Sequence, residues 1–147
     1  MSSIVVDASV VVKLLVEQPD SADAESVLEP GIWRYAPEFL HIEVANALWA
    51  YARKKLISAE LYKNLLHRSF GFEIQTQRDH DLLASASALA VEYEHPVYDC
   101  LYLALAISRG AQLVTADKRF CNRFASSQHA SSMVMLAQYA HSQSARP

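Results

Sequence analysis

The segment that decides the expected fold is the N-terminal stretch Ile4-Val5-Val6-Asp7-Ala8-Ser9. It places an uninterrupted β-branched run directly before an aspartate, a pattern typical of a strand covered on both faces, as in parallel sheets. A second stretch, Leu113-Val114-Thr115-Ala116-Asp117, repeats this arrangement late in the chain. Because ligand sites in open α/β sheets lie beyond the carboxyl ends of the strands, we expect both aspartates at one rim of a parallel sheet.

Helical patterns fill most of the sequence between these two stretches. The expected helices cover residues 10–17, 21–28, 38–56, 59–70, 80–93 and 98–108, with Ser9 as the cap of the first. Further short strands are expected at residues 32–36, 112–115 and 133–136, and residues 72–76 are expected to form a strand or a turn. This alternation of strands and helices predicts an α/β fold with a parallel sheet.

The composition indicates a single compact domain. The chain has 147 residues, 52% of them hydrophobic and 20% charged, and this length buries a core without disulfides or zinc. We find no secretory signal and no apolar run near the roughly 18 residues of a membrane span. Cys100 and Cys121 are therefore expected to be reduced, in a cytoplasm. The net charge of −3 does not exclude a nucleic-acid substrate, because the balance turns slightly positive if four acids hold a metal.

Glu43 is the acid that a structural role explains least well. It lies in the apolar stretch 39–52, beside the residues expected to face the core: Leu40, Val44, Ala47, Leu48 and Tyr51. Burying a glutamate is costly unless a cation or hydrogen bonds compensate its charge. The alternative is an ion pair with a nearby basic residue such as Arg53.

Asp99 falls in the first turn of the expected helix 98–108, where the helix dipole favours an acid. That role would explain Asp99 alone, as a turn or cap role would explain Asp7 or Asp117 alone. Four carboxylates gathered together would repel one another unless a divalent cation were bound. Magnesium prefers oxygen ligands, and such a site can activate water against a phosphodiester.

Four stretches resemble the signatures of PIN-domain ribonucleases, and they occur in the order of that family. They are residues 4–9, Glu43-Val44-Ala45-Asn46-Ala47-Leu48, residues 98–106 and Thr115-Ala116-Asp117-Lys118-Arg119-Phe120. The chain's compact size is similar to that of VapC-type toxins of VapBC toxin–antitoxin pairs. The resemblance implies a PIN-like (Rossmann-like) three-layer sandwich, a parallel sheet of about four to five strands with helices on both faces. We expect residues 1–141 to form this domain and residues 142–147 to fray.

The resemblance also implies a metal-dependent endoribonuclease that uses Mg²⁺, with Mn²⁺ as an alternative. The implied catalytic carboxylates are Asp7, Glu43, Asp99 and Asp117, and all but Glu43 would hold the metal. Polar support would come from Ser9, Asn46 and Thr115. Some relatives carry a further acid where Arg119 stands, which favours one well-held metal here. The basic side chains expected to meet RNA phosphates are Lys13, Lys118, Arg119 and Arg123.

The partners implied by the resemblance are RNA, an antitoxin protein and a second copy of the chain. Transfer RNA is a frequent target in this family. Ile42 and Trp49 lie nearly opposite the core-facing side of their helix and are expected at a partner interface.

Two other interpretations stay open. A degenerate PIN-like domain would bind RNA or protein without catalysis, although the presence of all four acids disfavours it. An α/β phosphatase would also carry Asp7 after a strand, but such enzymes need a second aspartate where Ser9 stands. The histidines, His95 among them, show no metal-ligand spacing and are expected at the surface or in caps.

Overall fold

The computed structural model describes residues 2–146 and contains a five-stranded sheet in which all pairings are parallel. The strand order is β3-β2-β1-β4-β5. The strands are β1 (Ser2–Val6), β2 (Ile32–Pro37), β3 (Ile74–Gln77), β4 (Gln112–Thr115) and β5 (Met133–Met135). The predicted α/β class with a parallel sheet is confirmed.

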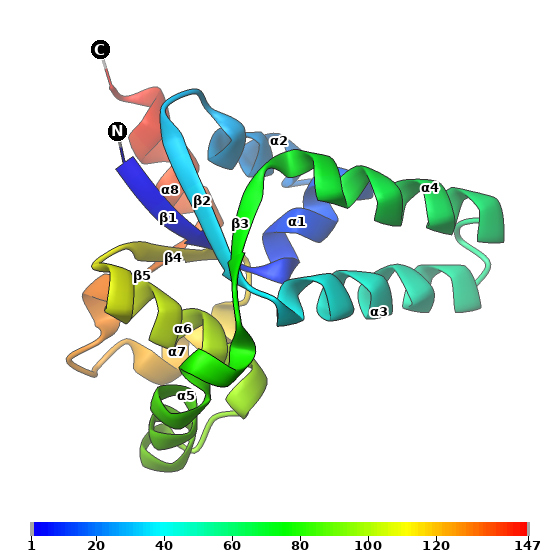
Figure 1. Ribbon diagram of the computed structural model, residues 1–147. Coiled ribbons are helices and arrows are strands. Elements are labelled where there is room, and N and C mark those ends of the chain that lie inside the picture. The colour runs from blue at the N-terminus through cyan, green and yellow to red at the C-terminus, as the bar shows by residue number, and fades with distance from the viewer. Residues whose placement is uncertain (1, 147) are drawn as a thin grey trace.

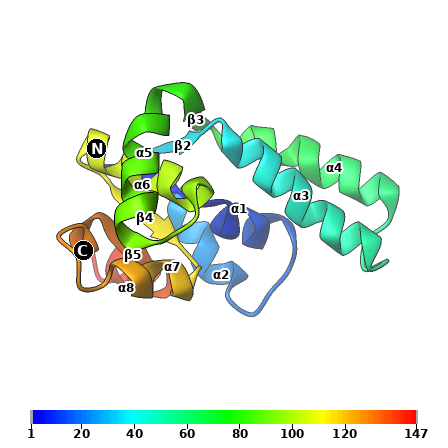
Figure 2. The same cartoon turned by 90° about the horizontal axis from the view of Figure 1, so that it is seen from below.

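Helices cover both faces of this sheet (Figure 1). On one face pack α1 (Ala8–Leu15), α2 (Ser21–Ala24) and α8 (Leu136–Ser144), and on the other α5 (Asp79–Tyr93) and α6 (Val97–Arg109). A short α7 (Lys118–Phe124) follows β4, and 3₁₀ turns form at Glu25–Leu28, Phe70–Phe72 and Ala130–Ser132. The antiparallel helices α3 (Phe39–Arg53) and α4 (Ala59–Ser69) project from the body in both views (Figures 1 and 2).

The central strand β1 lies between β2 and β4, and the connectivity of the sheet reverses there. The chain runs from β1 through β2 to the edge strand β3, then returns to add β4 and β5 on the other side. The register pairs Val6 with Val114, so Asp7 comes to lie beside Thr115. Side chains that follow β1 and β4 therefore meet at the crevice where open α/β sheets bind ligands.

The core is built from the central strands and α6. Val5, Val6, Leu113 and Val114 are completely buried. Seven consecutive α6 residues, from Cys100 to Ala106, are also buried, because the sheet covers one side of this helix and α5 packs against it. Neither cysteine forms a disulfide. Within residues 2–146, no helix is both long and apolar enough to cross a membrane.

The structure corrects one expectation about the start of a helix. Helix α1 begins at Ala8, and the Ser9 hydroxyl donates a hydrogen bond to Asp7 instead of capping a later start. Helix α8 continues to Ser144, with Tyr139 and Ala140 buried on its inner face, and the fraying expected of residues 142–147 stays a prediction. Of the remaining tail, Pro147 lies outside the described residues, as Met1 does at the other end.

Helix α5 should stabilise the fold mainly through its inner face. Leu82 is 3% exposed, whereas the adjacent Leu83 is 46% exposed. We predict that Leu82→Ala lowers the free energy of unfolding by about 2–5 kcal/mol through lost burial and a cavity. The matched variant Leu83→Ala should change it by less than about 0.5 kcal/mol. Urea unfolding followed by circular dichroism measures both, and equal losses would contradict this packing.

Candidate active site

The carboxyl ends of β1 and β4 open into a cleft of about 460 Å³ between α1, α3 and the start of α6. Its lining includes all four acids singled out in the sequence, Asp7, Glu43, Asp99 and Asp117. They arrive from four separate segments: the end of β1, the middle of α3, the first turn of α6 and the loop after β4. We call this hollow the acid cleft.

Asp7 is the most firmly held of the four acids. Its Oδ2 accepts hydrogen bonds from the hydroxyls of Ser9 and Thr115, the latter at 2.7 Å. The loop after β4 fixes both hydroxyls, because Ser9 Oγ accepts the Ala116 N–H and Thr115 Oγ1 accepts the Asp117 N–H, each at 3.0 Å. Burial raises the pKa of Asp7, the two hydroxyls oppose this effect, and the charges of Asp99 and Asp117 reinforce it.

Glu43 reaches the acid cleft from α3 with one carboxylate oxygen unpartnered. Its Oε1 is buried and accepts no hydrogen bond from any described residue. Burial, followed by the negative charge of Asp7, raises the pKa of Glu43 to about 8, although the neighbouring Tyr102 hydroxyl opposes this effect. The alternative pairing with Arg53 is wrong, because that guanidinium lies over the Trp49 ring, 5.1 Å from its centroid. A buried oxygen without a hydrogen-bond donor destabilises the folded state unless a ligand binds to it.

Tyr102 belongs to the site although the sequence analysis assigned it no role. The residue is completely buried in α6, and its hydroxyl lacks a hydrogen-bond partner among residues 2–146. Burial and the charges of Asp7 and Glu43 raise the pKa of this hydroxyl, which therefore stays protonated and can donate to Glu43 or to a ligand. The sequence did contain a signal for this role: Tyr102 lies in an otherwise apolar helical segment, and a buried tyrosine hydroxyl usually needs a hydrogen-bond partner.

Asp99 is oriented by His95. The Nε2 of His95 lies 2.7 Å from Asp99 Oδ2, and the imidazole stacks on Phe120 with a centroid distance of 4.8 Å. The expectation of a surface or capping histidine is therefore wrong, since only 12% of this side chain is exposed. Burial raises the pKa of Asp99, whereas His95 lowers it. The four-residue spacing of the pair was the signal that sequence reasoning missed.

Asp117 and three further predicted residues take different positions. Asp117 caps α7, with its Oδ1 accepting the Phe120 N–H at 3.1 Å. Asn46 is exposed on α3 and does not line the acid cleft, and the polar support expected from it stays a prediction. Ala47 and Tyr51, expected in the core, line the acid cleft instead.

The four residues predicted to bind RNA phosphates lie at different places relative to the acids. Arg119 and Arg123 line an adjoining hollow of about 580 Å³ that shares Asp99 and Asp117 with the acid cleft. Lys118 is exposed at the start of α7. The fourth basic residue is already paired: Lys13 Nζ lies 2.8 Å from Asp20 Oδ1.

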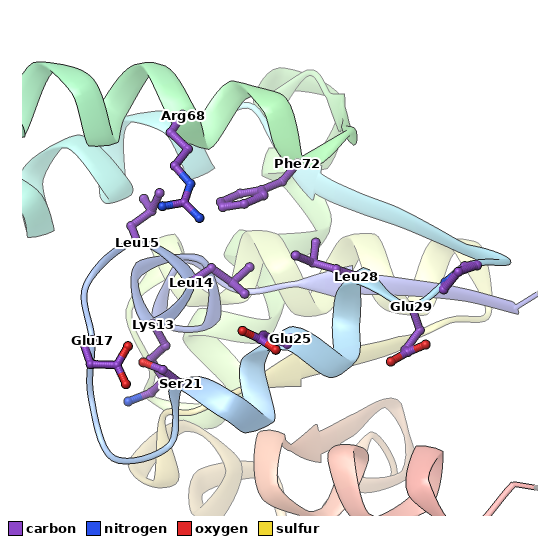
Figure 3. Close-up of a pocket in the computed structure, with 11 residues that line it drawn as sticks. Lys13, Leu14, Leu15, Glu17, Ser21, Glu25, Leu28, Glu29, Arg68 and Phe72 are labelled. Carbon is purple, nitrogen blue, oxygen red and sulfur yellow. The ribbon is translucent and has the colours of Figure 1, made fainter.

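A separate hollow of about 570 Å³ lies between α1, the 25–28 turn and α4 (Figure 3). Arg68 extends into it from α4, and Glu25 approaches from the opposite wall. It shares Lys13 with the acid cleft but none of the four acids. Its walls carry both acidic and basic side chains, so this hollow does not share the cluster of carboxylates that characterises the acid cleft.

The acid cleft suits a hard divalent cation by the chemistry of its donors, all of which are oxygens. In residues 2–146, however, no three acidic, histidine or cysteine side chains stand close enough to form a ready metal-binding group. Mg²⁺ usually takes one or two carboxylates directly and completes its octahedron with water, so it does not need such a group. The unpartnered Oε1 of Glu43 and the raised pKa values of three of the acids fit a site whose charge a cation would neutralise.

Comparisons with known proteins give one consistent result. The PIN domain family model matches residues 4–123 of this chain. Ribonuclease VapC3 of Pyrobaculum aerophilum is 32% identical over 123 residues, which cover 82% of this chain and 94% of the relative. The crystal structure of PAE2754 from the same organism has a TM-score of 0.73 at 20% identity, covering 99% of this chain and 91% of that one. VapBC2 from Rickettsia felis, bound to a fragment of its promoter DNA, has a TM-score of 0.62 at 15% identity, covering 90% and 96%.

The raised pKa of Glu43 should reduce the stability of the cation-free protein. Its ordinary pKa is 4.5 and its folded value about 8, so between these pH values the folded state holds a proton that the unfolded state has lost. Stability therefore falls as the pH rises through this window and levels off above it. We predict that Glu43→Gln in EDTA raises the free energy of unfolding at pH 8 by about 1–2 kcal/mol, discounted for partial solvation, and has little effect at pH 4.

Urea unfolding in EDTA at the two pH values measures this effect. Glu92→Gln, at an exposed position of α5, is the matched control and should leave stability unchanged at both. A Glu43→Gln protein no more stable than the wild type at pH 8 would show that Glu43 is not under the electrostatic stress described.

Proposed function

This chain belongs to the PIN-domain family, and we propose on that premise that it is a metal-dependent endoribonuclease, the toxin of a type II toxin–antitoxin pair. The observation that carries the proposal is the convergence of four carboxylates on one cleft, with the buried Oε1 of Glu43 left unpartnered. Further support comes from the 32% identical relative, which is named as a ribonuclease, and from VapBC toxin–antitoxin proteins of the same fold.

The side chains of the acid cleft divide into two roles. Asp7, Asp99 and Asp117 would hold Mg²⁺ or Mn²⁺, and the bound cation would supply Lewis-acid activation of water and offset the charge that develops on the scissile phosphate. The hydroxyls of Ser9 and Thr115 orient Asp7. These fixed contacts lower the cost of assembling the site during the reaction.

Glu43 is the proposed proton acceptor. It orients the attacking water and takes its proton while the water oxygen bonds to phosphorus. The bond from phosphorus to the leaving ribose oxygen then breaks, and that oxygen takes a proton from solvent. A carboxylate whose pKa is raised towards neutrality is a stronger base than an exposed one, and the protonated Tyr102 hydroxyl beside it can hold it in place by donating a hydrogen bond. The exposed Lys118, Arg119 and Arg123 would bind RNA phosphates next to this site.

The proposal predicts that Asp7→Asn abolishes RNA cleavage while the fold remains. The amide keeps the hydroxyl contacts but loses the negative charge, so cleavage should fall by at least about 100-fold. A fluorogenic RNA incubated with Mg²⁺, Mn²⁺ or EDTA measures the rate, and Asp81→Asn at an exposed position of α5 is the matched control. Cleavage should also stop in EDTA.

Each competing outcome points to a different conclusion. Undiminished cleavage by Asp7→Asn, or cleavage that resists EDTA, would overturn the proposed chemistry. RNA binding without cleavage under every metal condition would favour a binding module without catalysis. A covalent acyl-phosphate at Asp7 would favour a phosphatase.

The proposal also includes a protein-binding surface on α3. Ile42 and Trp49 lie two helical turns apart on this helix and are 63% and 51% exposed. Large apolar side chains exposed on one helix face are typical of interaction surfaces. We therefore propose that a second copy of the chain packs here and that an antitoxin protein is the further partner.

We predict that the double variant Ile42→Glu/Trp49→Glu shifts the protein from dimer to monomer, because two buried charges would have to be desolvated in the interface. Analytical ultracentrifugation at micromolar concentrations measures the change. Leu83→Glu, at an exposed position of α5, serves as the control and should remain dimeric. A monomeric wild type, or a dimeric double variant, would contradict this interface.

A further inference from the structure

An aromatic pair, an exposed tyrosine stacked on a half-buried phenylalanine, lies next to Asp99, which lines the acid cleft. Tyr98 immediately precedes Asp99 in α6 and is 61% exposed. Its ring stacks on that of Phe39, with the centroids 5.0 Å apart and the planes inclined by 15°. The Phe39 N–H donates a hydrogen bond to Asp79 Oδ1 at 3.0 Å, which ties the first residue of α3 to α5. The pair is therefore supported by three helices, unlike an isolated surface side chain.

The pair is in register with the proposed proton acceptor. Phe39 lies four residues before Glu43 on α3, and Tyr98 lies four residues before Tyr102 on α6. Residues four apart share one face of a helix and are separated by about 6 Å along its axis. Glu43 and Tyr102 therefore lie on the same faces of α3 and α6 as the stacked rings, one helical turn further along each helix. The aromatic pair lies about one helical turn from the proton acceptor.

The chemistry of the acid cleft explains why RNA needs such a pair. Carboxylates repel phosphates, so the acid side chains themselves provide no electrostatic attraction for the substrate, which must come from a bound cation and the basic residues nearby. Stacking of a base on an exposed aromatic ring contributes about 1–3 kcal/mol and does not depend on charge or on the identity of the base. Sequence-specific and non-specific RNA-binding proteins both use tyrosine and phenylalanine rings for this purpose.

We propose that Tyr98, backed by Phe39, stacks on the nucleobase next to the scissile phosphate and positions that nucleotide in the acid cleft. Tyr98 is a positioning residue in this scheme, and Phe39 holds its ring in place. The inference rests on the proposed ribonuclease function. Because a stacked ring makes no hydrogen bonds to base edges, it fixes the position of the nucleotide without selecting a sequence.

The first experiment compares three substitutions at Tyr98 by steady-state cleavage of an RNA oligonucleotide. Tyr98→Ala and Tyr98→Leu should raise KM by about 5- to 150-fold, the equivalent of one lost stacking contact, with kcat nearly unchanged. Tyr98→Phe keeps the aromatic face and should behave as the wild type. A leucine at position 98 still covers the Phe39 ring, so Tyr98→Leu distinguishes the loss of the aromatic ring from the loss of packing. Urea unfolding reports whether each variant is folded.

The second experiment locates the stacked base and does not require catalysis. In the cleavage-deficient Asp7→Asn background, an RNA carrying 2-aminopurine beside the cleavage position should lose fluorescence on binding, and adding Tyr98→Leu should restore it. Replacing the same nucleotide by an abasic site should weaken binding to Asp7→Asn but not to the Asp7→Asn/Tyr98→Leu protein. This loss of additivity is specific to a contact between ring and base.

The outcomes separate this inference from the proposed function. A wild-type protein that neither binds nor cleaves RNA would overturn both. RNA cleavage that depends on Asp7, combined with a wild-type KM for folded Tyr98→Leu and unchanged 2-aminopurine fluorescence, would overturn the inference alone. Loss of self-association in Tyr98→Leu with unchanged RNA kinetics would also overturn it, because the ring would then belong to a protein interface.

Discussion

The parallel pairing of β1 with β4 fixes the position of Asp7, and the rest of the candidate site is arranged around that residue. The register that sets Val6 opposite Val114 brings the Thr115 hydroxyl to the Asp7 carboxylate. A shift of one residue would turn every side chain of the strand to the other face of the sheet. It would also separate the Ser9 and Thr115 hydroxyls from the carboxylate that both contact. The buried Val residues of β1 and β4 therefore help to position the candidate site through the register of their strands, although none of them reaches the acid cleft.

The same packing that positions the acids also places them under electrostatic stress. Burial raises the pKa of Asp7, Glu43 and Asp99, so the cation-free protein carries a group of carboxylates that resist ionisation together. Asp7 accepts hydrogen bonds from two hydroxyls and Asp99 pairs with His95, whereas Oε1 of Glu43 has no hydrogen-bond partner among the described residues. Strain of this kind is typical of functional sites, where stability is reduced in favour of chemistry.

The residue pattern alone predicted the strands, the parallel sheet and the position of the acids after β1 and β4. These features follow from the hydrophobic pattern of each segment and from the order of strands and helices along the chain. Resemblance added the family and the ribonuclease and toxin interpretations, whereas the four acids had already been singled out by their positions. The four-residue spacing of His95 and Asp99 was the sequence signal for their pairing, but the stacking of Phe120 on the imidazole, which holds it in place, could not be read from the sequence. The roles of Ala47 and Tyr51 were misjudged for a related reason: helical periodicity identifies a buried face, but it does not distinguish core from the wall of a cleft. Helix α7, only seven residues long, is too short for periodicity to reveal.

The order of the sheet has a consequence for how the protein is made. The acid cleft takes side chains from positions 7 to 117 of a 147-residue chain, and its centre is closed by β4, the fourth strand to leave the ribosome. A chain still in synthesis can pair β1 with β2, yet it has neither Thr115 to hold Asp7 nor Asp117 to complete the set of acids. The cleft is therefore assembled only after β4 and Asp117 have been synthesised, and until then the nascent chain has no complete acid site.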